Sequence, residues 1–65
     1  MTPRDKAIDE LRKEGYRFER HGTNHDIYYN PELKCSIPVK RHQFTENTLR
    51  YIRKEMKQNR RDKSE

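Results

Sequence analysis

Apolar residues near the beginning of the chain recur at the spacing of an α-helix. Three of them lie at i, i+1 and i+4 and form one narrow stripe: Ala7, Ile8 and Leu11. Thr2 can cap the first turn, Pro3 fits the first helical position, and Gly15 suits a left-handed C-terminal cap. The pattern therefore predicts an amphipathic helix over residues 3–14.

A second helical stripe lies near the end of the chain. Its members follow the spacing i, i+3 and i+7: Leu49, Ile52 and Met56. Thr45 is a cap candidate in front of the stripe, and the pattern ends near Asn59. We expect a second helix there, followed by a basic, disordered tail over residues 60–65 that holds no apolar side chain.

Between the two helices the period changes from helical to alternating, as in half-buried strands. Three runs alternate in this way: residues 16–19, 25–29 and 35–39. Turn signals separate the runs at residues 21–24 and 30–31. The pattern predicts two successive antiparallel hairpins. Because proline cannot donate to a ladder, Pro38 predicts that the third strand is an edge strand or that its outward N–H side is unpaired at that position.

The element order helix, strand, strand, strand, helix defines an α+β fold. A three-stranded antiparallel sheet buries one face with two helices, so we expect both helices on that face and the other face open. We expect one domain over residues 1–59, with the outline of double-stranded-RNA-binding domains, an analogy that does not by itself assign a function. The predicted core comprises Ile8, Leu11, Phe18, Ile27, Ile37, Val39, Leu49, Ile52 and Met56.

The composition leaves room for a small core only. Of the 65 residues, 28% are hydrophobic and 42% are charged, which excludes a large pocket enzyme. The single cysteine, Cys35, forms no internal disulfide and leaves no cysteine pair for zinc. Lys and Arg number 16 against 11 Asp and Glu, a net charge of +5, so polyanions are the expected partners.

Membrane and cofactor motifs are absent from the sequence. No apolar run approaches the roughly 18 to 20 residues that span a bilayer, and the first residues lack the hydrophobic stretch of a signal peptide. We therefore expect a cytoplasmic protein with no membrane partner. Neither a glycine-rich phosphate loop nor a nucleophile elbow occurs, which argues against nucleotide hydrolysis and acyl transfer and predicts no cofactor.

Three histidines, His21, His25 and His42, are the side chains suited to proton transfer near neutral pH. His25 is the strongest catalytic candidate, because it begins a strand directly after the turn at residues 22–24. A partly buried histidine that only shapes the hairpin is the alternative. A metal site formed by His21, His25 and Asp26 is a weaker alternative, because these residues lack the spacing of zinc motifs. We therefore expect no metal.

Basic and aromatic residues form a second constellation, suited to RNA. Arg and Lys contact phosphates, and a tyrosine on the open face of the sheet can stack a base. Strand parity places Tyr28 on that face, and Tyr29 and Tyr51 belong to the same constellation. The expected RNA contacts are Arg20, Thr23, Asn24, Tyr28, Lys40, Arg41 and Arg50. The alternative is that the charges keep a small domain soluble and the tyrosines fill gaps at the sheet edges.

Five segments together resemble a known family of small proteins. They are residues 11–16 (LRKEGY), 20–28 (RHGTNHDIY), 37–39 (IPV), 41–42 (RH) and 47–50 (NTLR), the last followed by Ile52, Arg53 and Lys54. The stretch Gly-Thr-Asn-His-Asp-Ile-Tyr, at this distance after a helix-capping Gly-Tyr, is the most specific of them. From about Ile8 to Lys57 the chain closely resembles the HicA family of toxins.

The resemblance implies the toxin of a type II toxin–antitoxin pair. Such a toxin is a metal-independent ribonuclease of double-stranded-RNA-binding-like fold that cleaves mRNA and arrests translation, and a HicB-type antitoxin covers its active site. The family's catalytic histidine corresponds to His25 and its turn glycine to Gly22. Many relatives have Ser-His before the matching Ile-Tyr, whereas this chain has His25 and Asp26. An acidic neighbour orients the imidazole if the two side chains meet, but it also repels phosphate.

Two other function classes stay open beside the ribonuclease. In a non-catalytic binding module the same basic surface holds structured RNA or DNA, and His25 only shapes the hairpin. In an interaction protein the open face or an edge strand pairs with another chain. The second class is compatible with a toxin function, because a bound partner stabilises a small domain that has no disulfide.

Overall fold

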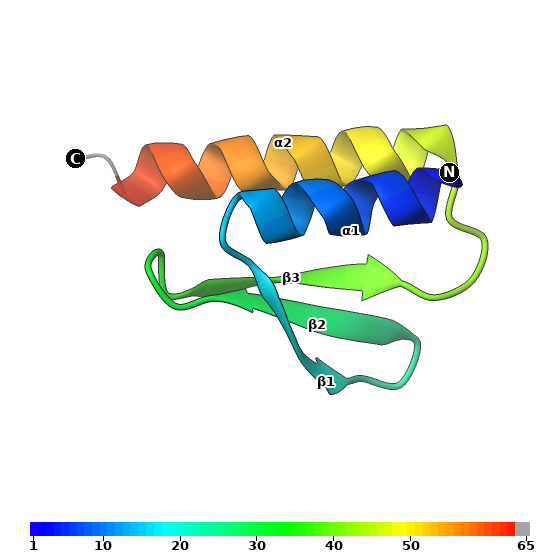
Figure 1. The fold of residues 1–65 in the computed structure, drawn as a ribbon, viewed down its shortest axis with the longest axis horizontal. Helices are drawn as coiled ribbons and strands as arrows, with labels where there is room; N and C mark the ends of the chain where they lie inside the picture. The colour runs from blue at the N-terminus through cyan, green and yellow to red at the C-terminus, as the bar shows by residue number, and fades with distance from the viewer. Residues whose placement is uncertain (64–65) are drawn as a thin grey trace.

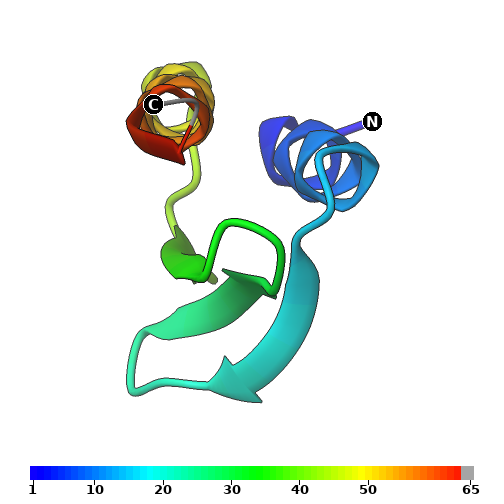
Figure 2. The same cartoon turned by 90° about the vertical axis from the view of Figure 1, so that its left-hand side faces the viewer.

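Two helices lie side by side over one face of a three-stranded antiparallel sheet, whose other face is open (Figure 1, Figure 2). The computed structural model describes residues 1–63. The elements are α1 (Pro3–Lys13), β1 (Arg17–His21), β2 (His25–Asn30), β3 (Cys35–Lys40) and α2 (Glu46–Lys63). The strands lie in the order β1-β2-β3, so the predicted α+β fold and its two hairpins are confirmed.

α1 begins and ends with the signals that its sequence predicts. The Thr2 hydroxyl accepts a hydrogen bond from the N–H of Asp5, whose carboxylate accepts one from the N–H of Thr2, which together form a capping box. At the other end Gly15 has a φ of 99°, and the N–H of Tyr16 donates to the carbonyl of Leu11 at 2.9 Å. This Schellman turn ends the helix at a position where glycine avoids the cost of a left-handed backbone.

α2 is longer than predicted. It continues past Asn59 to Lys63, and the guanidinium of Arg60 forms an ion pair with the carboxylate of Glu14 at 3.1 Å. The tail predicted over residues 60–65 is therefore helical as far as Lys63, and its last two residues lie outside the described residues. Within residues 1–63, neither helix combines the length and the hydropathy that crossing a membrane requires.

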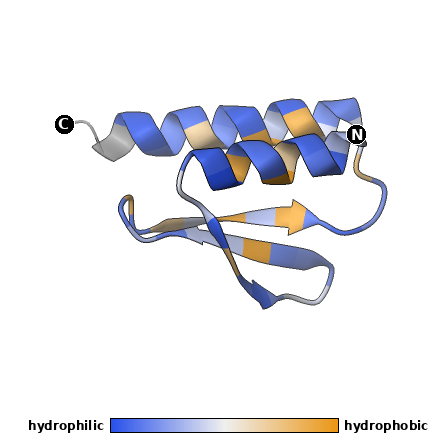
Figure 3. Ribbon diagram, in the orientation of Figure 1, coloured by the Kyte–Doolittle hydropathy of each residue, from blue (hydrophilic) through white to orange (hydrophobic). Residues whose placement is uncertain are grey.

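The core lies between the helices and the sheet. Figure 3 shows both helices mostly in blue, the colour of hydrophilic residues, with hydrophobic residues in orange at separate turns. This is the pattern expected of amphipathic helices. The buried members are Ala7, Leu11, Tyr16, Tyr28, Ile37, Val39, Leu49, Ile52 and Met56. The predictions that the structure confirms are Leu11, Ile37, Val39, Leu49, Ile52 and Met56. Ile8 is partly buried against this core.

The predicted faces of Ile27 and Tyr28 are wrong. Tyr28 is 5% exposed and packs in the core, whereas Ile27 is half-buried on the open face, opposite the exposed Pro38. β2 carries apolar residues at both parities, so hydrophobicity alone does not select its inner face. Asp26 and Asn30 share the inner parity with Tyr28, and both are buried and accept or donate side-chain hydrogen bonds there.

A β-bulge in β1 accounts for the position of Phe18. The register shifts between Phe18 and Arg20, which leaves Glu19 as an extra residue in β1. Phe18 and His21 therefore share the face of Tyr28, and the rings of Phe18 and His21 have centroids 4.8 Å apart. Because β1 is an edge strand, Phe18 remains 45% exposed, and its prediction as a core residue is wrong.

The amide of Asn30 joins the end of α1 to the turn after β2. Its Nδ2 donates to the carbonyl of Glu14 at 3.1 Å, and its Oδ1 accepts from the N–H groups of Glu32 and Leu33 at 2.9 and 3.1 Å. Asn30 is 1% exposed, so these bonds satisfy a side chain that is costly to bury unpaired. Two chain reversals thus depend on one buried side chain.

We predict that Gly15→Ala destabilises the protein by about 1–2 kcal/mol, because alanine at a positive φ pays the left-handed backbone strain. The added Cβ would also lie 3.4 Å from Nδ2 of Asn30. Thermal unfolding followed by circular dichroism should show the melting temperature falling by about 4–8 °C per kcal/mol for a domain of this size. Lys6→Ala, at an exposed helical position, is the control and should change stability by about 0.5 kcal/mol at most. An unchanged melting temperature for Gly15→Ala would contradict the prediction.

Candidate active site

His25 follows a tight turn formed by residues 22–24. The N–H of Gly22 donates to the carbonyl of His25 at 2.6 Å. A Cβ built on Gly22 would lie 3.0 Å from that same carbonyl oxygen, a backbone atom with little room to yield. Glycine is needed here because the two strands of the hairpin approach each other closely, and this close approach sets where β2 begins.

The side chain of Arg41 braces this turn from the loop after β3. Its guanidinium donates to the carbonyls of Gly22 and His25 at 2.9 and 3.3 Å, and also to the carbonyl of Thr23. The same guanidinium donates to Oδ1 of Asp26 at 2.9 Å. A planar group with five donors can hold several acceptors at once. The backbone on both sides of His25 is therefore held in place by one side chain.

Asp26 collects three positively charged or hydrogen-bonding groups on the helix-covered face. Its Oδ2 accepts from Arg4 of α1 at 2.7 Å, and its Oδ1 lies 2.7 Å from Nδ1 of His21 and 2.9 Å from Arg41. Asp26 is 7% exposed. The hydrogen bonds from His21 and Arg41 lower the pKa of Asp26 to about 2 and outweigh burial, which acts in the opposite direction. Asp26 is a charged structural hub.

Asp26 and His25 do not meet, because consecutive residues of a strand point to opposite faces. Asp26 faces the helices and holds His21, whereas His25 lies on the open face with Ile27. The hypothesis that Asp26 orients the imidazole of His25 is thus wrong. The alternative metal site of His21, His25 and Asp26 fails for the same reason. Within residues 1–63 no group of three His, Cys, Asp or Glu side chains is placed to hold a metal ion.

His25 and Lys40 form a cross-strand pair on the open face. They are direct partners in the antiparallel register of β2 and β3, which brings their Cβ atoms to about 5 Å. His25 is half-buried and Lys40 is exposed. Among the described residues, none makes a hydrogen bond or ion pair with the imidazole of His25 or the ammonium of Lys40. Both groups are available to a ligand.

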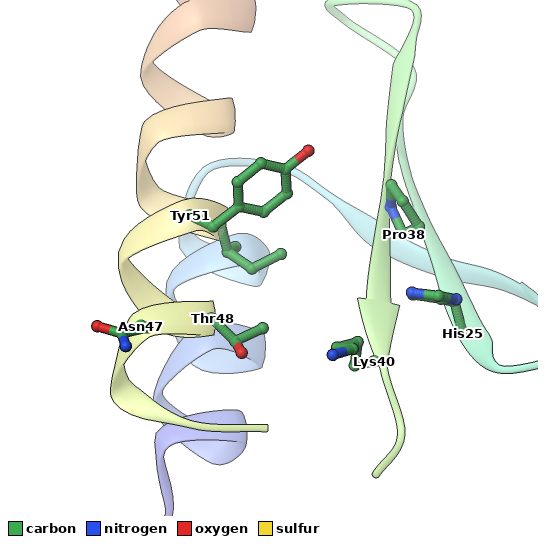
Figure 4. Close-up of a pocket in the computed structure, with 7 residues that line it drawn as sticks. His25, Pro38, Lys40, Asn47, Thr48 and Tyr51 are labelled. Atoms are coloured by element: carbon green, nitrogen blue, oxygen red, sulfur yellow. The ribbon is translucent and has the colours of Figure 1, made fainter. Parts of the chain in front are cut away.

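Two hollows meet at this pair. The first, the α2–β3 groove, has a volume of about 420 Å³ and is lined by His25, Pro38, Lys40, Asn47, Thr48, Tyr51 and Ile52 (Figure 4). The second, the loop hollow, has a volume of about 290 Å³ and is lined by Asn24, His25, Lys40, His42 and Gln43. A group bound at His25 and Lys40 therefore has space on two sides.

The structure separates the other predicted RNA contacts. Arg20 lies on the open face opposite Ile27, with a side chain 71% exposed. Arg50 lies on α2 and donates to the side chain of Asn47 at 3.1 Å. Tyr28 is buried, so the prediction that it stacks a base on the open face is wrong, and the tyrosine of β2 on that face is Tyr29.

The polar side chains that α2 contributes to the groove, Asn47 and Thr48, were missing from the sequence prediction. Asn47 and Thr48 line the groove because α2 packs beside β3, a contact that no local pattern encodes. One indication of the groove was present in the sequence, because Tyr51 lies outside the apolar stripe of α2.

No family model, curated protein or solved structure matches this chain.

We predict that Asp26→Asn destabilises the protein by about 2 kcal/mol at neutral pH, the value that a pKa lowered from 3.8 to about 2 implies. Because the folded pKa lies below the unfolded one, this stability is present above about pH 4 and is lost as the pH falls toward 2. Urea unfolding at several pH values should show the difference between wild type and variant shrinking over that range.

Asp9→Asn is the matched control for this prediction. Asp9 forms an exposed pair with Lys13 at 3.1 Å on α1, the kind of ion pair that contributes little. Its loss should change the free energy of unfolding by less than about 0.5 kcal/mol. If Asp26→Asn is no more destabilising than Asp9→Asn at neutral pH, Asp26 is not a hub.

Proposed function

We propose that this chain is a metal-independent endoribonuclease that cleaves mRNA, acting as the toxin of a type II toxin–antitoxin pair with a HicB-type antitoxin as its partner. The sequence supports it by its resemblance to the HicA family. The observation that carries the proposal is the cross-strand pair of His25 and Lys40, whose side chains make no hydrogen bond among the described residues and line two hollows. The layering of two helices on one face of the sheet supports an RNA partner by analogy.

The chemistry requires few protein groups, because RNA carries its own nucleophile. His25 takes the proton of the 2′-hydroxyl, whose oxygen forms a bond to the adjacent phosphorus while the bond from phosphorus to the 5′-oxygen breaks. The products are a 2′,3′-cyclic phosphate and a 5′-hydroxyl. DNA lacks the 2′-hydroxyl and is not cut.

Lys40 stabilises the charge that develops on the phosphate. Its ammonium stands beside His25 in both hollows, and a positive charge aimed at the transition state lowers the barrier more than one aimed at the substrate. Arg20, on the same open face, is placed to hold a flanking phosphate. Arg41 contributes indirectly, since its donors hold the turn that carries His25.

His42 supplies the proton that the departing 5′-oxygen needs. It lines the loop hollow together with His25 and Lys40, so a phosphate bound there has two histidines among its neighbours. After the step, His25 carries the proton from the 2′-hydroxyl and His42 has lost one, so the two exchange protons with water before the next cleavage.

We predict that the wild-type protein cleaves a defined mRNA in EDTA and that His25→Ala lowers the rate by about 10² to 10⁴, the usual size of a general acid–base contribution. Product ends are read by gel mobility before and after phosphatase treatment. Lys6→Ala, at an exposed position of α1 outside both hollows, is the control and should leave cleavage intact.

The expected substrate dependence is equally sharp. A single 2′-deoxy nucleotide at the scissile position should abolish cleavage, and cutting of that substrate would exclude the mechanism. If wild type and His25→Ala both bind RNA and neither cleaves it, the chain is a non-catalytic RNA-binding module.

We predict that His42→Ala slows mRNA cleavage by at least about 10²-fold but leaves intact the cleavage of a uridine 3′-nitrophenyl phosphate. Nitrophenolate departs without a proton, so that substrate needs the base at His25 and no general acid. His25→Ala should slow both reactions. Equal losses on both substrates in His42→Ala would assign His42 a role other than proton donation.

A further inference from the structure

The α2–β3 groove extends from the proposed catalytic pair to an exposed aromatic ring. Figure 4 shows Tyr51 and Thr48 projecting from α2 toward β3, with Lys40 and His25 on the other side of the groove. Its volume of about 420 Å³ falls within the range of pockets that hold small organic groups. The groove therefore offers one charged end and one aromatic end.

Tyr51 is an exposed aromatic residue of α2. It is 54% exposed, although it precedes the fully buried Ile52 on the same helix. Phe18, another exposed aromatic residue, contacts the rings of His21 and Tyr28, whereas Tyr51 has no aromatic partner within residues 1–63. Only 28% of the residues of this chain are hydrophobic. An exposed aromatic ring at the edge of a groove therefore points to a ligand that contacts it.

The chemistry of the two ends matches one nucleotide of RNA. Lys40 and His25 attract a phosphate, and an aromatic ring offers a stacking surface to any base. Thr48 also lines the groove, although its hydroxyl already lies 3.3 Å from both the backbone nitrogen and the hydroxyl of Thr45.

We propose that the α2–β3 groove binds the base of the nucleotide next to the scissile phosphate, stacked on Tyr51, which rests on the proposed ribonuclease function. A base inside a duplex has both faces covered by its neighbours, so only an unpaired base can enter the groove. The substrate is therefore single-stranded at the cleavage position.

The test measures binding of an uncleavable, fully 2′-O-methylated single-stranded oligonucleotide by fluorescence anisotropy at fixed salt. Tyr51→Ala should weaken binding roughly tenfold, the loss expected for one stacked base, while Tyr51→Phe, which keeps the ring, should stay within about twofold of wild type. Phe18→Ala, which removes an exposed ring far from the groove in sequence, is the aromatic control and should bind as wild type. Circular dichroism verifies that each variant is folded.

The same assay with a blunt duplex of equal length separates the outcomes. Tyr51→Ala should leave duplex affinity unchanged, and equal weakening for both nucleic acids would overturn the proposal. Unchanged single-strand affinity in Tyr51→Ala would also overturn it and would leave the groove to a protein partner. Because binding is measured without cleavage, a wild type that binds by Tyr51 but cuts no RNA removes the ribonuclease function and leaves the single-strand site standing.

Discussion

The carboxylate of Asp26 is the interaction on which both the fold and the candidate site depend. It is almost fully buried and accepts from Arg4, His21 and Arg41, so α1, β1, β2 and the segment after β3 meet at one group. Breaking a buried ion pair by removing one partner is costly, because the other charge stays behind without compensation. This chain has a small core and no disulfide. The network around Asp26 therefore fixes the relative positions of four segments.

Arg41 transmits this constraint to the proposed catalytic turn. Its guanidinium reaches Asp26 on one side and the carbonyls around His25 on the other. Lysine in its place would supply the charge without the fork of donors, so the geometry requires arginine. The use of Arg41 in the scaffold also leaves Lys40 as the cation beside His25. A site with so few catalytic side chains suits a reaction in which the substrate itself carries the nucleophile.

Much of the architecture was predictable because its signals are local. The caps of α1, its terminal Gly15 and the stripe of α2 each lie within a few residues, and all three predictions hold. The end of α2 and the inner face of β2 were not predictable. They depend on partners distant in sequence, such as Glu14 for Arg60.

The same distinction explains what was found at the candidate site. The turn before His25 was visible as a glycine followed by polar residues, so its location followed from local sequence. The buried role of Asp26 was not visible, because it depends on Arg4 and Arg41, one on each side of it in the chain and both distant from it. A carboxylate beside a histidine invites the assumption that the two interact, whereas strand geometry separates them.

That separation makes the strand register the deciding constraint for function. In β2, the side chain of His25 lies on the open face and that of Asp26 on the face covered by the helices. A shift of the strand register by one residue would therefore exchange the faces of these two side chains. The slip would bury an imidazole beside two arginines and would place a carboxylate where a phosphate is expected. Two features oppose it: the bulge at Glu19 sets the pairing with β1, and the buried amide of Asn30 holds the other end of β2. Neither feature touches the proposed substrate, yet both decide which side chain it meets.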